Sequence, residues 1–191
     1  MSLEQLYQQV ILDHYKEKHG HGTRPPGPGL LEATSHQYNP LCGDEVTLQV
    51  AVSVPADGAA PVVRDVAWVG DGCSISQASS SVLYDLVLGQ PIDRAEELVE
   101  AFRTMVRGRG AVEPDEDLLG DAIAFVGVGR HANRVKCAML GWTAFEDALH
   151  RAVATAAVTA QPSTAGPSTA GPSTAGPSTA EPSTLTGEET R

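Results

Sequence analysis

Three cysteines and one aspartate are the residues of this chain best suited to chemistry. Cys42 and Asp44 lie two positions apart in the stretch NPLCGD, residues 39–44, and Cys73 and Cys137 follow further along. A thiol held on a turn bracketed by proline and glycine is exposed enough to react or to bind a soft cation. Taken alone, however, Cys42 and Asp44 are more typical of an ordinary turn before a strand, because turns favour Gly, Pro, Asn and Asp.

The surroundings of the other two cysteines make a metal site a better hypothesis. Cys73 follows Gly-Asp-Gly and Cys137 follows Arg-Val-Lys, each at the predicted start of a helix, where free N–H groups and the helix dipole stabilise a thiolate. With Cys42 and Asp44 they form a set of three thiolates and one carboxylate, which suits tetrahedral zinc. A single cysteine is more often a small buried hydrophobic residue than a metal ligand. The spacing of the four residues is by itself only a moderately specific sign of a metal site.

Two other kinds of site are disfavoured. The glycines at residues 70–72 lack the third glycine of a dinucleotide fingerprint and the Gly-Lys-Ser/Thr of a phosphate-binding loop. His131 could pair with Cys137 as a Cys-His nucleophile, but no third residue that would orient the histidine is evident. A hydrolase of that type is therefore a minor alternative.

Charge and composition limit the possible partners. The chain of 191 residues has 13 Lys and Arg against 24 Asp and Glu, which gives a net charge of −11 and argues against nucleic acid or an anionic membrane as a partner. The first residues, MSLEQ, resemble no secretory signal, and no apolar run approaches the roughly 18 residues of a membrane span. We therefore expect a cytoplasmic protein, whose three cysteines suit metal or thiol chemistry better than disulfides.

Hydrophobic periodicity predicts an α+β fold, a three-stranded antiparallel sheet with helices packed mainly on one face. The strongest strand pattern is the alternation over residues 46–54. The predicted strands are 46–54, 63–69 and, less clearly, 30–38, and the predicted helices are 3–18, 75–88, 93–107, 115–126 and a last one from about residue 133.

Smaller features add three local expectations. Asp93 with Glu96 is typical of a capping box at the start of the third helix. His14, His19 and His21 lie near the end of the first helix, where imidazole suits the helix C-terminus, and are expected on the surface rather than as ligands. A turn is expected at residues 55–58, PADG, between the second and third strands.

The composition divides the chain into two parts. Residues 1–158 carry the helix and strand patterns, and residues 159–191 consist of Pro-Ser-Thr-Ala-Gly repeats with almost no large apolar side chain. Such a segment cannot bury enough surface to offset its ordering entropy, so a disordered C-terminal tail is expected.

Several blocks, taken in order over about residues 3–155, make the sequence similar to a known family. The blocks are LY at 6–7, DHY at 13–15, NPLCGD at 39–44, GDGCSIS at 70–76, and RVKCAML at 134–140 with Trp142. They resemble iron-sulfur cluster assembly proteins of the IscU/NifU N-terminal type. Lys136, where scaffold members usually have histidine, and the long connection from Cys73 to Cys137 resemble the SufU branch.

The resemblance implies zinc held by Cys42, Asp44, Cys73 and Cys137, and a PLP-dependent, SufS-like cysteine desulfurase as partner. The chain would be a sulfurtransferase-like carrier that activates the desulfurase and supplies the downstream iron-sulfur assembly machinery of the SUF system. Docking would displace Cys42 from zinc, and the freed thiolate would take the terminal persulfide sulfur. Arg134 would either lie behind the ligands and balance their charge or be an ordinary surface arginine.

Two competing hypotheses remain. In the first, the same four ligands build and transfer an iron-sulfur cluster, so that the protein is an IscU-like scaffold; Lys136 in the histidine position weighs against it. In the second, zinc stabilises an interaction domain that performs no sulfur chemistry.

Overall fold

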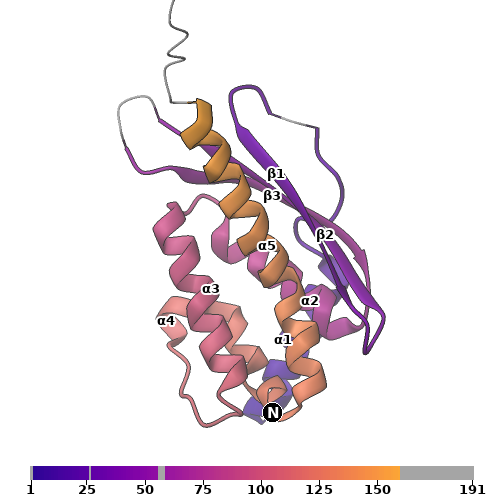
Figure 1. Cartoon of the computed structure of the whole chain (residues 1–191). Helices are drawn as coiled ribbons and strands as arrows, with labels where there is room; N and C mark the ends of the chain where they lie inside the picture. The colour runs from indigo at the N-terminus through magenta and orange to yellow at the C-terminus, as the bar shows by residue number, and fades with distance from the viewer. Residues whose placement is uncertain (1, 26, 56–58, 160–191) are drawn as a thin grey trace, which may run out of the picture. The chain divides into compact units, whose positions relative to one another are not determined.

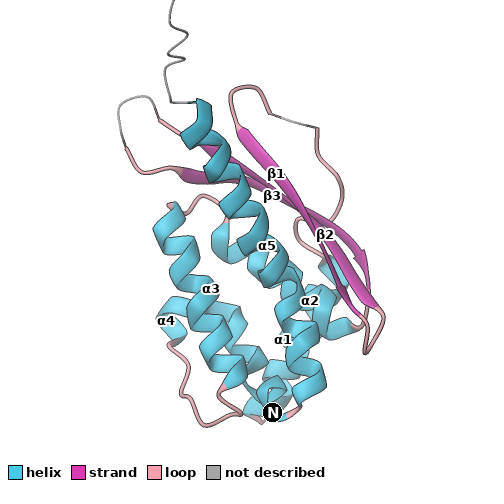
Figure 2. Ribbon diagram, viewed as in Figure 1, coloured by secondary structure: helices cyan, strands magenta, loops and turns pink. Residues whose placement is uncertain are grey.

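The computed structural model describes residues 2–25, 27–55 and 59–159, which form an antiparallel sheet with a layer of helices (Figure 1, Figure 2). The strands are β1 (Leu31–Asn39), β2 (Asp44–Ser53) and β3 (Val62–Asp71), and the helices are α1 (Leu3–Glu17), α2 (Ser74–Val87), α3 (Ile92–Arg107), α4 (Glu116–Leu119), the 3-10 helix η1 (Gly120–Arg130) and α5 (Ala132–Thr159).

Strand β2 is the central strand of the sheet, which has the order β1-β2-β3 with both neighbours antiparallel. The alternation predicted for this strand is present, because its apolar side chains at every second position are buried: Val46, Leu48, Val50 and Val52. Leu48 lies opposite Trp68 and Val50 opposite Val66 on β3. The weaker prediction over residues 30–38 is also confirmed, as β1.

Helix α5 crosses one face of the sheet and contacts β1 and β2, and α2 packs between α5 and α1 (Figure 2). Phe102 of α3 stacks on Trp142 of α5 with ring centroids 4.0 Å apart, so the outer helix is joined to the central one by aromatic contact. The predicted α+β class, with helices mainly on one face of a three-stranded antiparallel sheet, is confirmed for the described residues.

Two local predictions were wrong. The single helix expected over residues 115–126 is the one-turn helix α4 followed by η1, because Gly120 adopts φ 46° and ψ −130°, which no α-helix can contain. The capping box of Asp93 and Glu96 is also absent, since α3 begins one residue earlier, after Pro91, without a side-chain cap. Asp93 still lies in the first turn, where its charge complements the helix dipole.

Two predictions fall on residues outside the described part of the chain. The turn at residues 55–58 includes 56–58, and the tail at 159–191 is described only at its first residue, so both stay predictions. None of the helices in the described part combines the length and the hydrophobicity that crossing a bilayer requires.

A buried serine joins α2 to α5. The hydroxyl of Ser79 donates to the carbonyl oxygen of Ala138 at 2.7 Å and accepts from the indole N–H of Trp142 at 2.9 Å. Ser79 and Trp142 are both fully buried, so no water molecule from the solvent can replace this hydroxyl as the hydrogen-bond partner of the indole N–H.

We predict that Ser79→Ala lowers the free energy of unfolding by about 1–3 kcal/mol, because the Trp142 N–H loses its partner inside the core. Ser80→Ala is the matched control, since the equally buried Ser80 hydroxyl only donates to the carbonyl of Ser76 in its own helix. Urea denaturation of both variants measures the difference. Equal losses in the two variants would contradict the role given to Ser79.

Candidate metal centre

Cys42 lies at the tip of the hairpin between β1 and β2. Asn39 and Asp44 pair across the hairpin, and the carbonyl oxygen of Asn39 accepts from the N–H groups of Cys42 at 3.3 Å and Gly43 at 2.9 Å. Gly43 has φ +76°, a conformation that favours glycine. This tight turn leaves the Cys42 side chain exposed.

Asp44 is the buried carboxylate of the site, with 3% of its surface exposed. Its Oδ1 accepts from the backbone N–H of Cys73 at 3.2 Å, whereas Oδ2 is buried without a hydrogen-bond partner among the described residues. Gly72 lies directly against it: a Cβ at that position would come within 2.9 Å of the Asp44 Cγ and 2.5 Å of the Ser76 hydroxyl. Glycine at position 72 is thus required for the carboxylate to fit.

Cys137 supplies the second thiol from α5 and is 5% exposed. Its sulfur lies 3.2 Å from the sulfur of Cys42 and 3.9 Å from the side-chain amide nitrogen of Asn39. One ligand atom from each of Cys42, Asp44 and Cys137 lies within 4.8 Å of the others. Segments 95 residues apart in sequence therefore converge on one point.

Cys73 is the predicted ligand that this group of three does not include. It is the N-cap residue of α2, as the sequence predicted, and its exposed thiol lies 3.8 Å from the Ser76 hydroxyl. Its backbone N–H nevertheless bonds to Asp44, so Cys73 borders the site.

The electrostatics of the group favour a cation. Burial alone would raise the pKa of Asp44, but the polar groups close to it, which are the side chains of Cys137, Cys73 and Ser76 and the backbone N–H of Cys73, outweigh burial and lower that pKa. Burial, followed by the proximity of Cys42 and Asp44, strongly raises the pKa of the Cys137 thiol. Burial and the neighbouring Cys42 and Asp44 therefore oppose a Cys137 thiolate, and a bound cation would stabilise the Asp44 carboxylate and the thiolate together.

The donor set fits zinc on two grounds. Thiolates with one carboxylate are ligands that the borderline-soft Zn²⁺ binds, and the unpartnered Oδ2 of Asp44 is a buried acceptor that a metal would satisfy. A closed hydrogen-bond network would leave no such oxygen. The assignment of Cys42, Asp44, Cys73 and Cys137 as one ligand set stays a prediction.

The predicted position at the start of a helix is confirmed for Cys73 but was wrong for Cys137. Helix α5 begins at Ala132, so Cys137 lies in the second turn, beyond the free N–H groups of the first. Burial dominates there and opposes the thiolate. Asn39 and Gly72 lie in the blocks that carry the family resemblance, but no contact in the site was predicted for either, because their roles depend on contacts across the hairpin and against Asp44.

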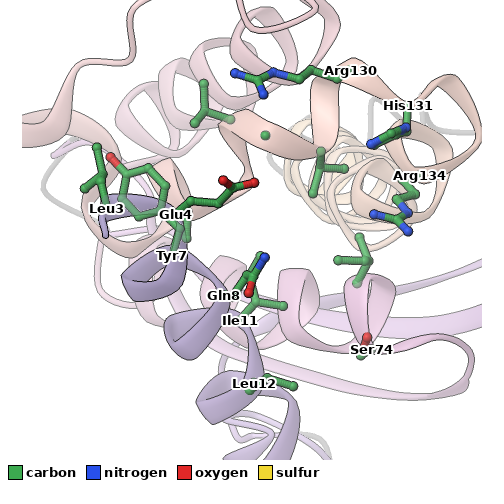
Figure 3. Close-up of a pocket in the computed structure, with 15 residues that line it drawn as sticks. Leu3, Glu4, Tyr7, Gln8, Ile11, Leu12, Ser74, Arg130, His131 and Arg134 are labelled. Carbon is green, nitrogen blue, oxygen red and sulfur yellow. The ribbon is translucent and has the colours of Figure 1, made fainter. Parts of the chain in front are cut away.

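A hollow of about 660 Å³ lies between α1, η1 and the first turns of α2 and α5, and Ser74, the residue after Cys73, is part of its lining (Figure 3). Glu4 and Gln8 extend into it from α1, and Arg130, His131 and Arg134 lie around its rim. Arg134 and His131 are exposed, and neither side chain forms a hydrogen bond or ion pair with a described residue. His131 is therefore not paired with Cys137, as a Cys-His nucleophile would require.

Comparison with known proteins shows the family. The NifU-like N terminal domain matches residues 6–138, about two thirds of the chain and a range that includes all three cysteines and Asp44. The chain belongs to the family of NifU-like N-terminal domains. The predicted resemblance is confirmed at this level.

The relatives of this NifU-like domain include proteins named as scaffolds and one named as a sulfurtransferase. It is 35% identical over 159 residues to the iron-sulfur cluster assembly scaffold protein IscU of Streptococcus pyogenes, covering 83% of this chain and 92% of the relative. It is 36% identical over 148 residues to the zinc-dependent sulfurtransferase SufU of Bacillus subtilis, covering 76% and 90%. A crystal structure from Fervidobacterium islandicum AW-1, described as an iron-sulfur cluster assembly scaffold protein for the SUF system, superposes with a TM-score of 0.61 at 32% identity and covers 78% of this chain and 99% of that one.

We predict that Asp44→Asn weakens zinc binding by at least about 10-fold. Mutation of a residue that only orients a metal ligand already lowers the metal affinity by about that factor. The amide keeps the shape of the carboxylate and an oxygen that can accept from Cys73. Competition with a chelator measures the affinity. Asp71→Asn, an exposed carboxylate at the end of β3, is the control and should bind zinc as the wild type does. Equal affinities in all three proteins would contradict the role of Asp44.

Proposed function

We propose that this NifU-like domain is a zinc-dependent sulfur acceptor in iron-sulfur cluster assembly, and that Cys42 receives sulfur from a PLP-dependent cysteine desulfurase. The observation that carries the proposal is the position of Cys42, whose exposed thiol lies on a hairpin tip within 4.8 Å of the ligand atoms of Asp44 and Cys137. The likeness to a relative named as a zinc-dependent sulfurtransferase supports it. The acidic surface fits a protein partner better than nucleic acid or membrane, and a reducing cytoplasm suits free thiols.

Four residues would hold the metal: Cys42, Asp44 and Cys137, with Cys73 as the fourth ligand. Bound zinc would keep these thiols deprotonated at neutral pH, which the metal-free site opposes at Cys137. The buried Oδ2 of Asp44 would gain the partner that it lacks.

Sulfur transfer itself is a thiol exchange on Cys42. The Cys42 thiolate attacks the terminal sulfur of the persulfide on the desulfurase cysteine, and a new sulfur-sulfur bond forms at Cys42. The bond between the two sulfurs of the donor breaks, and the desulfurase cysteine leaves as a thiolate. Cys42 then carries a persulfide, and the step needs no external oxidant or reductant.

Exposure favours Cys42 over Cys137 as the acceptor. Cys137 is only 5% exposed, so a sulfur on a partner protein cannot reach it directly. The neighbours of Cys42 on the hairpin, Tyr38 and Leu41, are exposed at 57% and 64% and offer apolar surface to a partner. Arg134, on the rim of the neighbouring hollow, would add positive charge beside the anionic ligands.

A scaffold function is the second candidate, because the chain is at least as similar to the relative named as an IscU scaffold, over 159 residues against 148 for the SufU relative. Here the same ligands would bind a nascent cluster as cargo rather than zinc. Lys136 in place of histidine disfavours it. Anaerobic reconstitution with iron and sulfide distinguishes the two: a scaffold gives a cluster that can be transferred to an apo acceptor, whereas a sulfur acceptor retains zinc and forms none.

We predict that the wild-type protein increases the turnover of a cognate cysteine desulfurase and that Cys42→Ser abolishes the increase, because an alkoxide does not form at neutral pH to attack the persulfide. Mass spectrometry should find one added sulfur atom on Cys42 of the wild type. Tyr38→Ala is the control, because it changes the exposed surface of the hairpin but leaves Cys42 in place. This variant should bind the desulfurase more weakly and still accept sulfur on Cys42.

Two results would contradict this proposal. Sulfur that accumulates on the Cys42→Ser variant would show that another cysteine is the acceptor. A wild-type protein that binds one zinc and gives no increase in turnover would favour the interaction domain without sulfur chemistry.

A further inference from the structure

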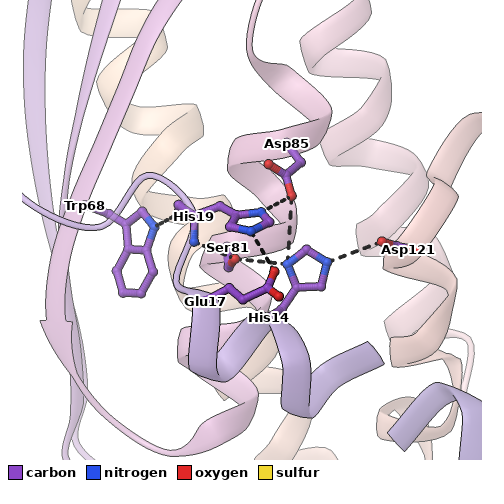
Figure 4. A network of polar contacts seen from close by, with 7 residues as sticks. All are labelled: His14, Glu17, His19, Trp68, Ser81, Asp85 and Asp121. Atoms are coloured by element: carbon purple, nitrogen blue, oxygen red, sulfur yellow. Dashed lines mark hydrogen bonds and ion pairs between the residues drawn. The ribbon is translucent and has the colours of Figure 1, made fainter. Parts of the chain in front are cut away.

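A second group of metal-binding side chains lies where α1 meets α2 (Figure 4). It consists of His14 on α1, His19 just after α1, and Asp85 on α2, with one ligand atom of each within 4.8 Å of the others. Nδ1 of His19 lies 2.6 Å and Nδ1 of His14 lies 3.9 Å from the same oxygen, Oδ2 of Asp85. The expectation that these two histidines are ordinary surface residues was wrong for His14, which is only 6% exposed.

Each histidine has a second carboxylate behind it. Nε2 of His19 lies 2.9 Å from Glu17 Oε2, and Nε2 of His14 lies 3.4 Å from Asp121 Oδ2 on η1 (Figure 4). Histidines that bind metals almost always donate the N–H of the other ring nitrogen to a carboxylate, carbonyl or water, which fixes the tautomer and the ring orientation. Both rings here have that arrangement, with Nδ1 facing Asp85 and Nε2 facing a different acid.

Ser81 contacts both histidines and is compatible with one tautomer of His14 that a metal could use. The Ser81 hydroxyl oxygen accepts from the backbone N–H of His19 at 2.9 Å and lies 3.0 Å from Nδ1 of His14. In the tautomer with the His14 N–H on Nε2, toward Asp121, the Ser81 proton can point to Nδ1. A metal at Nδ1 would then take the lone pair in place of that proton.

The group is held in place without a metal. The indole N–H of Trp68 on β3 donates to the carbonyl oxygen of His19 at 2.8 Å, and Ser81 accepts from the N–H of the same residue. The backbone of His19 is thus fixed against both β3 and α2. Preorganisation of this kind lowers the cost of assembling a ligand set.

We propose that Nδ1 of His14, Nδ1 of His19 and Oδ2 of Asp85 form a second binding site, for a divalent transition metal of the Zn²⁺ class. Two imidazoles and one carboxylate suit zinc and its neighbours rather than Ca²⁺ or Mg²⁺, which prefer oxygen ligands alone. The side chains of His19 and Asp85 are 36% and 43% exposed, so solvent has access to complete the coordination. The site shares no ligand with the thiol centre and does not depend on the proposed sulfur transfer.

The exchange of a proton for the metal is balanced. In the metal-free protein His19 faces a carboxylate at each ring nitrogen, and the hydrogen bond to Asp85 raises its pKa. A metal at Nδ1 takes the place of the proton shared with Asp85, which leaves as H⁺, while the N–H of Nε2 stays hydrogen-bonded to Glu17. No electron transfer is involved.

The test uses the full chain loaded with one zinc, so that the thiol centre is filled, and titrates it with Co²⁺ by calorimetry and visible absorption. We expect one further equivalent to bind, with d–d bands but no thiolate-to-cobalt charge-transfer band, because all three ligands are nitrogen or oxygen. Metal analysis after the titration should find the original zinc retained. Mutation of His14 is avoided because the residue is buried.

Asp85→Asn and His19→Gln keep approximate side-chain shape and should each weaken binding of this Co²⁺ at least 10-fold. The matched control is His150→Gln, since His150 on α5 also contacts a carboxylate, Glu96, but belongs to no group of three potential ligands among the described residues. Circular dichroism confirms folding of each variant. Absence of a further equivalent in the wild type, or equal binding by the wild type and both site variants, would overturn the proposal.

Discussion

The contact of the Asp44 carboxylate with the start of α2 is the interaction on which the candidate metal centre depends. The Asp44 side chain is buried, with 3% of the residue exposed. Its Oδ1 accepts a hydrogen bond from the Cys73 N–H, and its Oδ2 has no hydrogen-bond partner among the described residues. Such burial is costly unless the charge is compensated. Gly72 makes the contact possible, since any larger residue would collide with the carboxylate.

The same arrangement gives the three cysteines different freedom. Cys137 is buried in the second turn of α5, and Cys73 is the N-cap residue of α2, whereas Cys42 lies on an exposed turn with its sulfur 3.2 Å from that of Cys137. A ligand on a turn can leave its partners with little loss of packing, because few buried contacts hold it. The hairpin thus combines a buried carboxylate that fixes the site with a thiol that can reach a second protein.

The sequence was sufficient to predict helices and strands that have a local hydrophobic pattern. It was insufficient where contacts between distant segments determine the conformation or the burial of a residue. The alternation over β2 and the periodicity of α2 predicted those elements within one or two residues. The break at Gly120 depends on a single backbone conformation, and the burial of His14 depends on η1 packing over α1; neither leaves a periodic signal. Within the site, residue types and order indicated the ligands, but the closeness of Cys42 to Cys137 requires the folded hairpin against α5.

X-ray absorption at the zinc edge, on protein loaded with one zinc per chain, tests the central claim most directly. The account predicts three sulfur ligands and one oxygen ligand in the wild type, two sulfurs in Cys42→Ser, and no change in His19→Gln. Loading one zinc per chain keeps the proposed histidine site from contributing to the spectrum. A first shell without sulfur, or a Cys42→Ser spectrum identical to that of the wild type, would contradict the account.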